Sequence, residues 1–244
     1  MKLVFLDLDN TLIYSIKRIS NVKDFTCVER YRDKDLSFMT NTSIEKLNKL
    51  MKDDSITIVP ITTRVDYQFN RIKLPKFKYS LINNGGILLV DGKVDKNWFN
   101  LSLKYASSCI DELNKAISLL SVDSNIDYDI KFLNNLFIFT KSNDVNVTSS
   151  QLRGSLDTSK VSVYNQGNKI YVVPNMLNKG NAIKRLSERI VHDTIISAGD
   201  NNLDFSMAKF SDVFITSNNS CREPNAVISK RSIFSDEILD YIGG

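Results

Sequence analysis

The chain of 244 residues has few of the residues that several common kinds of site require. Its single histidine, His192, excludes a histidine-cluster metal site and argues against a Ser-His-Asp mechanism. The three cysteines, Cys27, Cys109 and Cys221, are widely separated and form no CxxC pair, which favours reduced, packing cysteines over a disulfide or a zinc site. Acid–base chemistry in this chain would therefore fall to carboxylates.

Long apolar runs and blocks of like charge are also missing. The chain begins Met1-Lys2 and continues with only four apolar residues before the first acidic one, which is too short for a signal peptide. No segment reaches the roughly 18 apolar residues of a membrane helix, so we expect a cytoplasmic protein without a membrane partner. The 32 basic and 28 acidic residues form no long block, which gives little reason to expect nucleic acid; the mild positive excess could help draw in an anionic substrate.

The two ends of the sequence alternate buried strands with amphipathic helices. Short apolar runs rich in β-branched residues predict strands at residues 3–6, 56–61, 194–198 and 213–215. Thr42 and Glu45 have the spacing of a capping box for a helix between the first two strands, and a second helix is expected after Lys179. This alternation predicts a parallel sheet with helices on both faces.

The middle of the sequence has a different pattern. A helical stretch at residues 101–120 precedes two strands, a helix and two further strands, expected at residues 128–132, 136–140, 147–156, 161–164 and 169–173. Runs of adjacent strands are typical of an antiparallel sheet. The predicted fold is therefore α/β, with a Rossmann-like parallel-sheet core (1–86 and 174–244) and an inserted α+β cap domain (87–173).

Two carboxylates, Asp7 and Asp9, directly follow the first predicted strand in the string Asp7-Leu8-Asp9-Asn10-Thr11. Ligands of open α/β sheets gather at the carboxyl ends of the strands. There, one carboxylate can attack phosphorus while the other serves the leaving oxygen as a general acid. A pair of solvated loop aspartates is the ordinary alternative, but the full string at a strand end favours a functional role.

Three further patterns lie at the ends of predicted core elements. Thr62 ends a strand and offers a hydroxyl to a phosphoryl oxygen, and Lys179 begins a helix, where free backbone N–H groups already favour an anion. Taken alone, a threonine that ends a strand is common, and a lysine at the start of a helix is generally a surface residue. Asp200 and Asp204, in a GDxxxD string after a strand, are hard oxygen ligands of the kind that suits Mg²⁺.

The four patterns occur in the order DxDxT, strand-end threonine, lysine and GDxxxD. In this order and spacing the sequence resembles the haloacid dehalogenase superfamily of phosphohydrolases. Its Cof-like branch and the sugar-phosphate phosphatases with a type-two cap are the most similar. The string Thr62-Thr63-Arg64 resembles that branch's T-G-R, and Asn84-Gly85 resembles its E-N-G. The resemblance covers nearly the whole chain, and in the cap it rests on the pattern of elements alone.

The resemblance implies a role for each matching residue. Asp7 would be the nucleophile and a metal ligand, and Asp9 the general acid and base whose backbone carbonyl also binds the metal. Thr62 and Lys179 would hold the phosphoryl oxygens, with Lys179 also steadying Asp7. Asp200 would be the second carboxylate ligand of Mg²⁺.

The same resemblance gives Asp204 a supporting role beside the metal or its waters. It implies a phosphatase that hydrolyses a small phosphorylated metabolite, a sugar phosphate among the candidates, under a cap that excludes bulk water. A phosphomutase would use the same residues, a regulatory protein could keep the fold without catalysis, and an enzyme acting on nucleic-acid ends would want an open basic groove instead of a cap.

Several positions depart from the pattern of the branch. Asn10 stands where glycine is usual, and Thr63 replaces the glycine after Thr62, so either threonine could supply the hydroxyl. Leu203 stands where the last motif has asparagine, which Asn201 or Asn202 could replace. The long segment 14–40 before the first helix is either an enlarged flap or a solvated surface excursion.

Overall fold

The computed structural model describes residues 1–244 and divides into two compact units. The core unit comprises Met1–Val94 and Lys179–Gly244, and the inserted unit comprises Asp95–Asn178. None of the helices combines the length and the apolar character that a membrane span needs.

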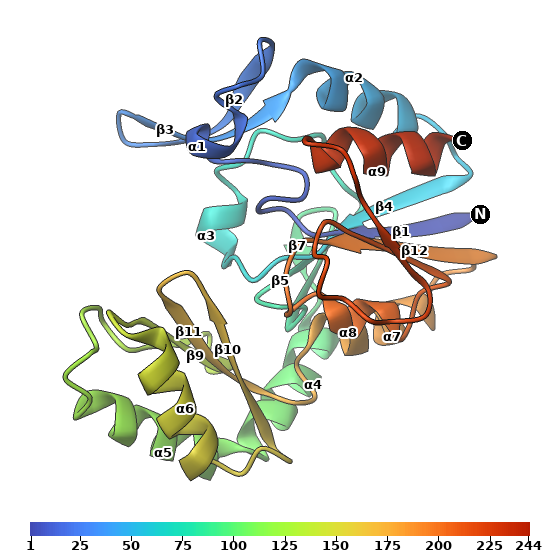
Figure 1. Cartoon of the computed structure of the whole chain (residues 1–244). Coiled ribbons are helices and arrows are strands. Elements are labelled where there is room, and N and C mark those ends of the chain that lie inside the picture. Colours follow the sequence, from blue (N-terminus) through green and yellow to red (C-terminus); the bar gives the residue numbers. More distant parts are fainter. The chain divides into compact units, whose positions relative to one another are not determined.

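A five-stranded parallel sheet forms the centre of the core unit (Figure 1). Its strand order is β14-β13-β12-β1-β4, with bounds Ala226–Ile228, Val213–Thr216, Thr194–Gly199, Lys2–Leu6 and Ile56–Pro60. Strand β1 pairs with both β4 and β12, so that Leu6 lies beside Pro60 on one side and Ala198 on the other. The predicted parallel sheet is confirmed, with β1 between its two neighbours.

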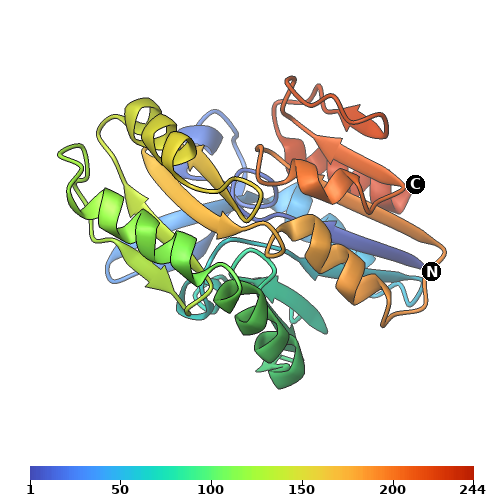
Figure 2. The same ribbon diagram turned by 90° about the horizontal axis from the view of Figure 1, so that it is seen from below.

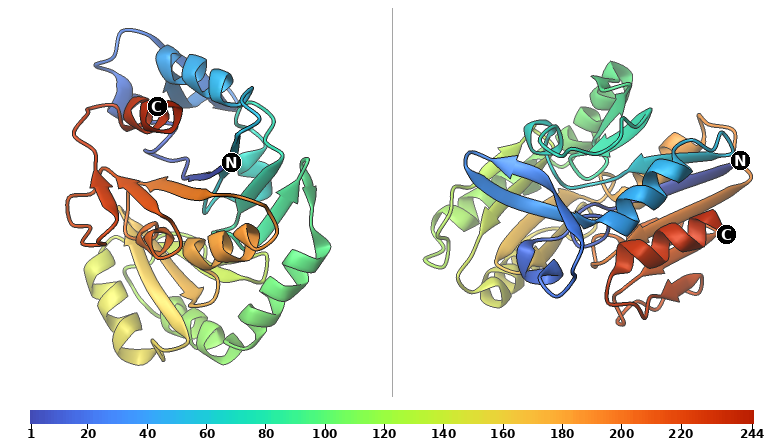
Figure 3. Two further views of the ribbon diagram at one scale, coloured as in Figure 1. Left: turned by 90° about the vertical axis from the view of Figure 1, so that its right-hand side faces the viewer. Right: turned by 90° about the horizontal axis from the view of Figure 1, so that it is seen from above.

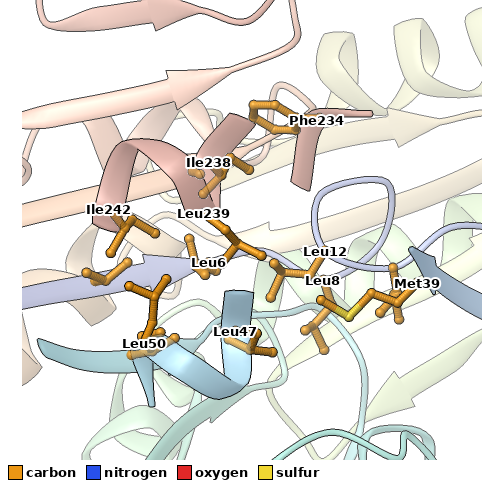
Figure 4. Close-up of a cluster of buried hydrophobic side chains, with 14 of the residues drawn as sticks. Leu6, Leu8, Leu12, Met39, Leu47, Leu50, Phe234, Ile238, Leu239 and Ile242 are labelled. Atoms are coloured by element: carbon orange, nitrogen blue, oxygen red, sulfur yellow. The ribbon is translucent and has the colours of Figure 1, made fainter. Parts of the chain in front are cut away.

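Helices cover both faces of this sheet. Helices α2 (Asn41–Leu50) and α9 (Phe234–Gly243) lie side by side above it in Figure 1 and in the right panel of Figure 3. Helices α7 (Lys179–Ser187) and α8 (Phe205–Ala208) lie on the opposite face. Figure 4 shows the apolar cluster on the α2 and α9 side, which includes Leu6, Leu8, Leu12, Met39, Leu47, Leu50, Phe234, Ile238, Leu239 and Ile242.

Helix α2 begins two residues earlier than the sequence predicted. Its N-cap is Thr40, whose hydroxyl accepts a hydrogen bond from the Ser43 N–H at 3.0 Å, and Thr42 lies inside the helix. An N-cap needs an extended backbone, and Thr40 has it because it is the last residue of strand β3. The predicted cap at Thr42 is therefore wrong.

Segment 14–40 contains a short helix and a β-hairpin that is buried toward its open end and exposed at its tip, residues 30–36. It contains α1 (Ile16–Ile19), β2 (Phe25–Tyr31) and β3 (Lys34–Thr40), and its buried residues include Val28, Glu29, Ser37 and Phe38. A wholly solvated surface excursion does not fit these buried residues, although the tip of the hairpin is exposed. We call β2 and β3 the flap hairpin.

Three further strands and a short helix complete the core unit. Helix α3 spans Asp66–Phe69, and β5 (Tyr79–Ile82), β6 (Ile87–Val90) and β7 (Lys93–Val94) form an antiparallel meander. An isolated bridge between Ile61 and Leu81 joins this meander to the chain just after β4.

The inserted unit is an antiparallel sheet with two helices on one face (Figure 2). The strand order is β10-β11-β9-β8, with bounds Val161–Gln166, Lys169–Pro174, Phe137–Lys141 and Lys131–Leu133. Apolar residues of α5 (Ile110–Ser121) and α6 (Val145–Ser155) pack on the sheet. The predicted hairpin at residues 161–173 is confirmed, because Gln166 pairs with Lys169 across a two-residue turn.

The helical stretch predicted at residues 101–120 is two helices. Helix α4 (Lys96–Ser107) ends before α5 begins, and Cys109 between them has non-helical dihedral angles. The Ser108 hydroxyl donates to the Tyr105 carbonyl, a local bond that competes with the helical ladder. Because both helices are amphipathic, the periodicity of the sequence does not show the break.

Candidate active site

The candidate site lies in the core unit, where three parallel strands end side by side. Asp7 follows β1, Thr62 follows β4 and Asp200 follows β12. The Asp7 N–H donates to the Ala198 carbonyl at 2.9 Å, and the Ile61 N–H donates to the Leu6 carbonyl at 2.8 Å. The sheet ladder thus continues to the first functional residue and fixes its backbone.

Lys179 lies between two buried carboxylates. Its ammonium is 2.6 Å from Oδ1 of Asp7 and 2.5 Å from Oδ1 of Asp204, and all three residues are almost fully buried. Thr11 donates to the other oxygen of Asp7 at 3.3 Å. The structure therefore brings the predicted nucleophile and the predicted lysine into direct contact, although 172 residues separate them in the chain.

Gly180 allows helix α7 to present Lys179 in this way. A Cβ built on Gly180 would lie 2.0 Å from the carbonyl oxygen of Ser206, at the start of α8. The Gly180 N–H also donates to the Ser206 hydroxyl at 3.1 Å. Only glycine permits this close approach of two backbones, which holds the first turn of α7 against α8.

Asp204 is a partner of Lys179 and a support of the loop after β12. Its Oδ2 accepts from the Asn201 N–H at 3.0 Å, and its other oxygen accepts from Lys179. A Cβ on Gly199 would lie 2.4 Å from the Asp204 side chain, so glycine at the end of β12 makes room for it. Both oxygens of Asp204 are therefore engaged within the protein, one by Lys179 and one by the backbone of the loop after β12.

The carboxylates of the site carry more negative charge than Lys179 balances. Burial raises the pKa of Asp200 to about 6, and the neighbouring Asp7 adds to the effect. Burial also raises the pKa of Asp7 and of Asp204, and Lys179 only partly opposes this. Burial alone would lower the pKa of Lys179, but Asp204 and Asp7 more than offset it and hold that pKa above its usual value.

The donor set suits a hard divalent cation. Ligand oxygens of Asp7, Asp200 and Asp204 all lie within 4.8 Å of one another. Mg²⁺ is commonly held by one or two carboxylates together with waters and substrate phosphate. Asp7 and Asp200 fit that description, since a cation between them would offset the repulsion that burial leaves uncompensated.

The last motif keeps a polar contact to Asp200 despite Leu203. Nδ2 of Asn201 donates to Oδ1 of Asp200 at 3.0 Å, and Oδ1 of Asn201 accepts from the Leu203 N–H at 2.9 Å. The Leu203 side chain is buried. Of the two candidate asparagines, Asn201 makes this contact, while Asn202 pairs with Asn218.

The structure also explains why asparagine stands at position 10, and it distinguishes Thr62 from Thr63. Asn10 has φ of 60°, in the left-handed region that asparagine tolerates better than other side chains, which explains why it replaces the usual glycine. Of the two candidate threonines, Thr62 is the fully buried one, and its hydroxyl accepts from the Arg64 N–H at 3.2 Å. The Thr62 hydroxyl proton is thereby left to donate elsewhere.

Asp9 is held by Arg64, a contact that sequence reasoning did not find. Nε and one terminal nitrogen of the guanidinium each lie 2.8 Å from one Asp9 oxygen. The third nitrogen lies 2.9 Å from Glu29 of the flap hairpin. In the sequence, Arg64 appears only as the last residue of the string Thr62-Thr63-Arg64, and Glu29 gives no signal because it lies in an ordinary strand pattern.

Comparisons with known proteins agree with this arrangement. A sequence model described as haloacid dehalogenase-like hydrolase matches residues 4–227. No curated protein sequence matches the chain.

Similar solved structures cover almost the whole chain at low sequence identity. Sucrose-phosphatase from Synechocystis sp. PCC6803, solved with sucrose and phosphate, has a TM-score of 0.68 at 14% identity and covers 99% of this chain and 96% of its own. Trehalose-6-phosphate phosphatase from Aspergillus fumigatus has a TM-score of 0.58 at 12% identity, covering 99% and 92%. The phosphatase BT1666 from Bacteroides thetaiotaomicron has a TM-score of 0.60 at 15% identity, covering 100% and 95%. These likenesses show a shared fold.

Proposed function

Because this chain belongs to the haloacid dehalogenase-like hydrolases, we propose that it is a Mg²⁺-dependent phosphatase acting on a small phosphorylated metabolite through an aspartyl-phosphate on Asp7. The observation that carries the proposal is the buried Asp7–Lys179–Asp204 cluster at the carboxyl end of β1. A buried carboxylate held by an ammonium is a fixed nucleophile beside a fixed positive charge, as attack on an anionic phosphate requires.

In the first step an Asp7 oxygen attacks phosphorus, and the bond from phosphorus to the leaving oxygen breaks with its electron pair. Asp9 gives its proton to that oxygen, which leaves as an alcohol. In the second step Asp9 takes a proton from water as the water oxygen attacks the same phosphorus. The bond to Asp7 then breaks, restoring its carboxylate and releasing inorganic phosphate.

Lys179 and Thr62 are suited to hold the transferred group. An ammonium has three N–H donors, and Lys179 uses two of them on Asp7 and Asp204, which leaves one for a phosphoryl oxygen. The Thr62 hydroxyl provides a second donor at the adjacent strand end. These two donors would hold oxygens of the phosphoryl group that Asp7 attacks.

Mg²⁺ would be held by the side chains of Asp7 and Asp200 and by the backbone carbonyl of Asp9. When bound, it supplies the positive charge that lets two anions approach each other. Asp204 holds Lys179 in place, and Asn201 holds Asp200 in place. The charge excess of the carboxylates supports this assignment.

The proposed substrates are small phosphate monoesters, with sugar phosphates the first to examine. Two of the similar structures are phosphatases named for sucrose and for trehalose 6-phosphate, which supports a sugar phosphate here. We therefore propose a screen of phosphorylated metabolites for phosphate release, with and without Mg²⁺. The sugar phosphates should be among the compounds hydrolysed, and removal of Mg²⁺ by a chelator should stop release.

The mechanism is tested by Asp7→Asn, with the exposed Asp54→Asn as the matched control. Asp7→Asn should abolish phosphate release, because an amide oxygen is a far weaker nucleophile, while Asp54→Asn should retain it. Acid-quenched wild-type protein should show a mass increase of one phosphoryl group that Asp7→Asn lacks. Release that survives Asp7→Asn would overturn the aspartyl-phosphate mechanism.

A further inference from the structure

Both carboxylate oxygens of Asp9 accept hydrogen bonds from Arg64. The two contacts, each 2.8 Å, form a fork between a planar guanidinium and a carboxylate, which is the strong geometry for such a pair. A carboxyl group that has to reach a leaving oxygen with one of its oxygens cannot keep this fork intact. Asp9 must therefore turn away from Arg64 during the reaction.

Arg64 cannot be left without an anion when this happens. Its side chain is only 13% exposed, whereas that of Asp9 is 45% exposed, so the cation is the more enclosed partner. Its neutral neighbours are the Ser37 hydroxyl and the Gln68 carbonyl, each 3.4 Å away. An enclosed cation that loses its carboxylate without replacement carries a large cost.

Glu29 of the flap hairpin already provides a second carboxylate. Its side chain is 1% exposed, and Oε2 lies 2.9 Å from Arg64 and accepts from the Ser37 hydroxyl at 2.6 Å. Its other oxygen accepts from Arg71 at 2.9 Å. Glu29 is thus fixed by three partners and does not need to move when Asp9 does.

The strand irregularity at Glu29 explains its inward direction. The pairing of β2 with β3 shifts register on either side of Glu29, which marks a bulge. Bulges redirect a side chain relative to the regular alternation of a strand. An isolated bridge from Glu29 to Ile72 holds the backbone here.

We propose that Glu29 is a positioning residue that releases Asp9 for proton transfer, by remaining on Arg64 as its counter-ion when Asp9 turns toward the reacting phosphate. The inference rests on the proposed phosphatase function and adds to it a role for the flap hairpin. Asp9, Arg64, Glu29 and Arg71 form a row of alternating charges. Departure of Asp9 leaves one carboxylate between two guanidinium groups, whereas loss of Glu29 would leave Asp9 bound as the only carboxylate on Arg64.

The test is Glu29→Gln assayed with p-nitrophenyl phosphate and with a sugar phosphate that the wild type hydrolyses. Nitrophenolate leaves phosphorus without needing a proton, so formation of the aspartyl-phosphate should stay fast. Its hydrolysis needs Asp9 as the base and should slow. We expect a nitrophenolate burst equal to the enzyme concentration, followed by a kcat lowered about tenfold or more. KM should fall with kcat, so that kcat/KM, which reports formation of the aspartyl-phosphate, stays nearly unchanged.

With the sugar phosphate, the first step itself needs the proton of Asp9. No burst of released sugar should therefore appear for Glu29→Gln. The two substrates thus separate a trapped Asp9 from general damage, which would remove the burst with p-nitrophenyl phosphate as well.

A second variant, Glu29→Gln with Arg64→Met, should be faster than Glu29→Gln alone, because it removes the cation that holds Asp9. The matched control is Asp35→Asn, which breaks the exposed Arg30–Asp35 pair on the same hairpin and should keep wild-type kcat. The inference is overturned by wild-type kcat in Glu29→Gln, by loss of its burst, or by a double variant no faster than the single one. Absence of phosphate release by the wild type would instead overturn the proposed function.

Discussion

Replacing Lys179 by methionine tests the charge balance of the site through stability. Methionine keeps most of the side-chain volume but leaves the buried carboxylates of Asp7 and Asp204 without their shared cation. Removing one partner of a buried ion pair costs about 3–5 kcal/mol, and here two carboxylates lose the same partner. For a protein of this size each kcal/mol corresponds to about 2–4 °C in Tm, so we expect Tm to fall by roughly 10 °C at neutral pH.

The loss of stability caused by Lys179→Met should depend on pH in a defined direction. In the variant, burial still raises the pKa of both carboxyl groups above the unfolded value, and the ammonium that opposed this effect is gone. A carboxyl group whose pKa is raised on folding binds its proton more tightly in the folded state, so stability decreases as pH rises between the two pKa values. The difference between Lys179→Met and wild type should therefore shrink as the pH falls from about 8 to about 5.

Urea denaturation followed by circular dichroism, in chelator at several pH values, measures this difference. Lys184→Met, in the last turn of the same helix and without a carboxylate partner in the cluster, is the matched control. A variant as stable as wild type at pH near 8 would refute the reasoning. A loss of stability that grows as the pH falls would also refute it, since protonation of the carboxylates should relieve the uncompensated charge.

Three further changes have expected outcomes. Gly180→Ala should cost about 1–3 kcal/mol by urea denaturation, because its Cβ would meet the Ser206 carbonyl, whereas Gly154→Ala, with open space in helix α6, should be neutral or stabilising. Asn10→Val should lower stability by about 1–2 kcal/mol, since a β-branched residue resists a φ of 60°, and Asn10→Gly should not; the same denaturation curves decide. Mg²⁺ at about 100 times its Kd should stabilise the wild type by about 2.7 kcal/mol in a thermal melt and Asp200→Asn by much less; equal shifts would contradict the assigned ligand.

Much of the core and of the site follows from local pattern in the sequence. Apolar β-branched runs at residues 3–6, 56–61 and 194–198 belong to strands buried on both faces, and such strands are parallel. Parallel strands end at one edge of the sheet, so the residues that follow them meet there. Asp7, Thr62 and Asp200 lie at that edge for this reason.

The Asp9–Arg64–Glu29 contacts could not be predicted in the same way. Glu29 lies in a strand where alternation would place a charged residue toward solvent, and only the bulge and two distant arginines bury it. The helix break at Cys109 and the cap at Thr40 were missed because both depend on local dihedral angles that the apolar period does not encode. Pairings between distant charges need the fold before they can be found.

The position of Lys179 has a consequence for how the protein folds. It is the first residue of the returning segment of the core unit, so the chain between Asp7 and Lys179 includes the whole inserted unit. Closing a loop of that length is a late event in folding, because the chain loses conformational entropy before the Asp7–Lys179 contact can stabilise it. During synthesis Asp7 therefore remains an uncompensated carboxylate until the returning segment has emerged, and the site becomes electrostatically complete only when the sheet does.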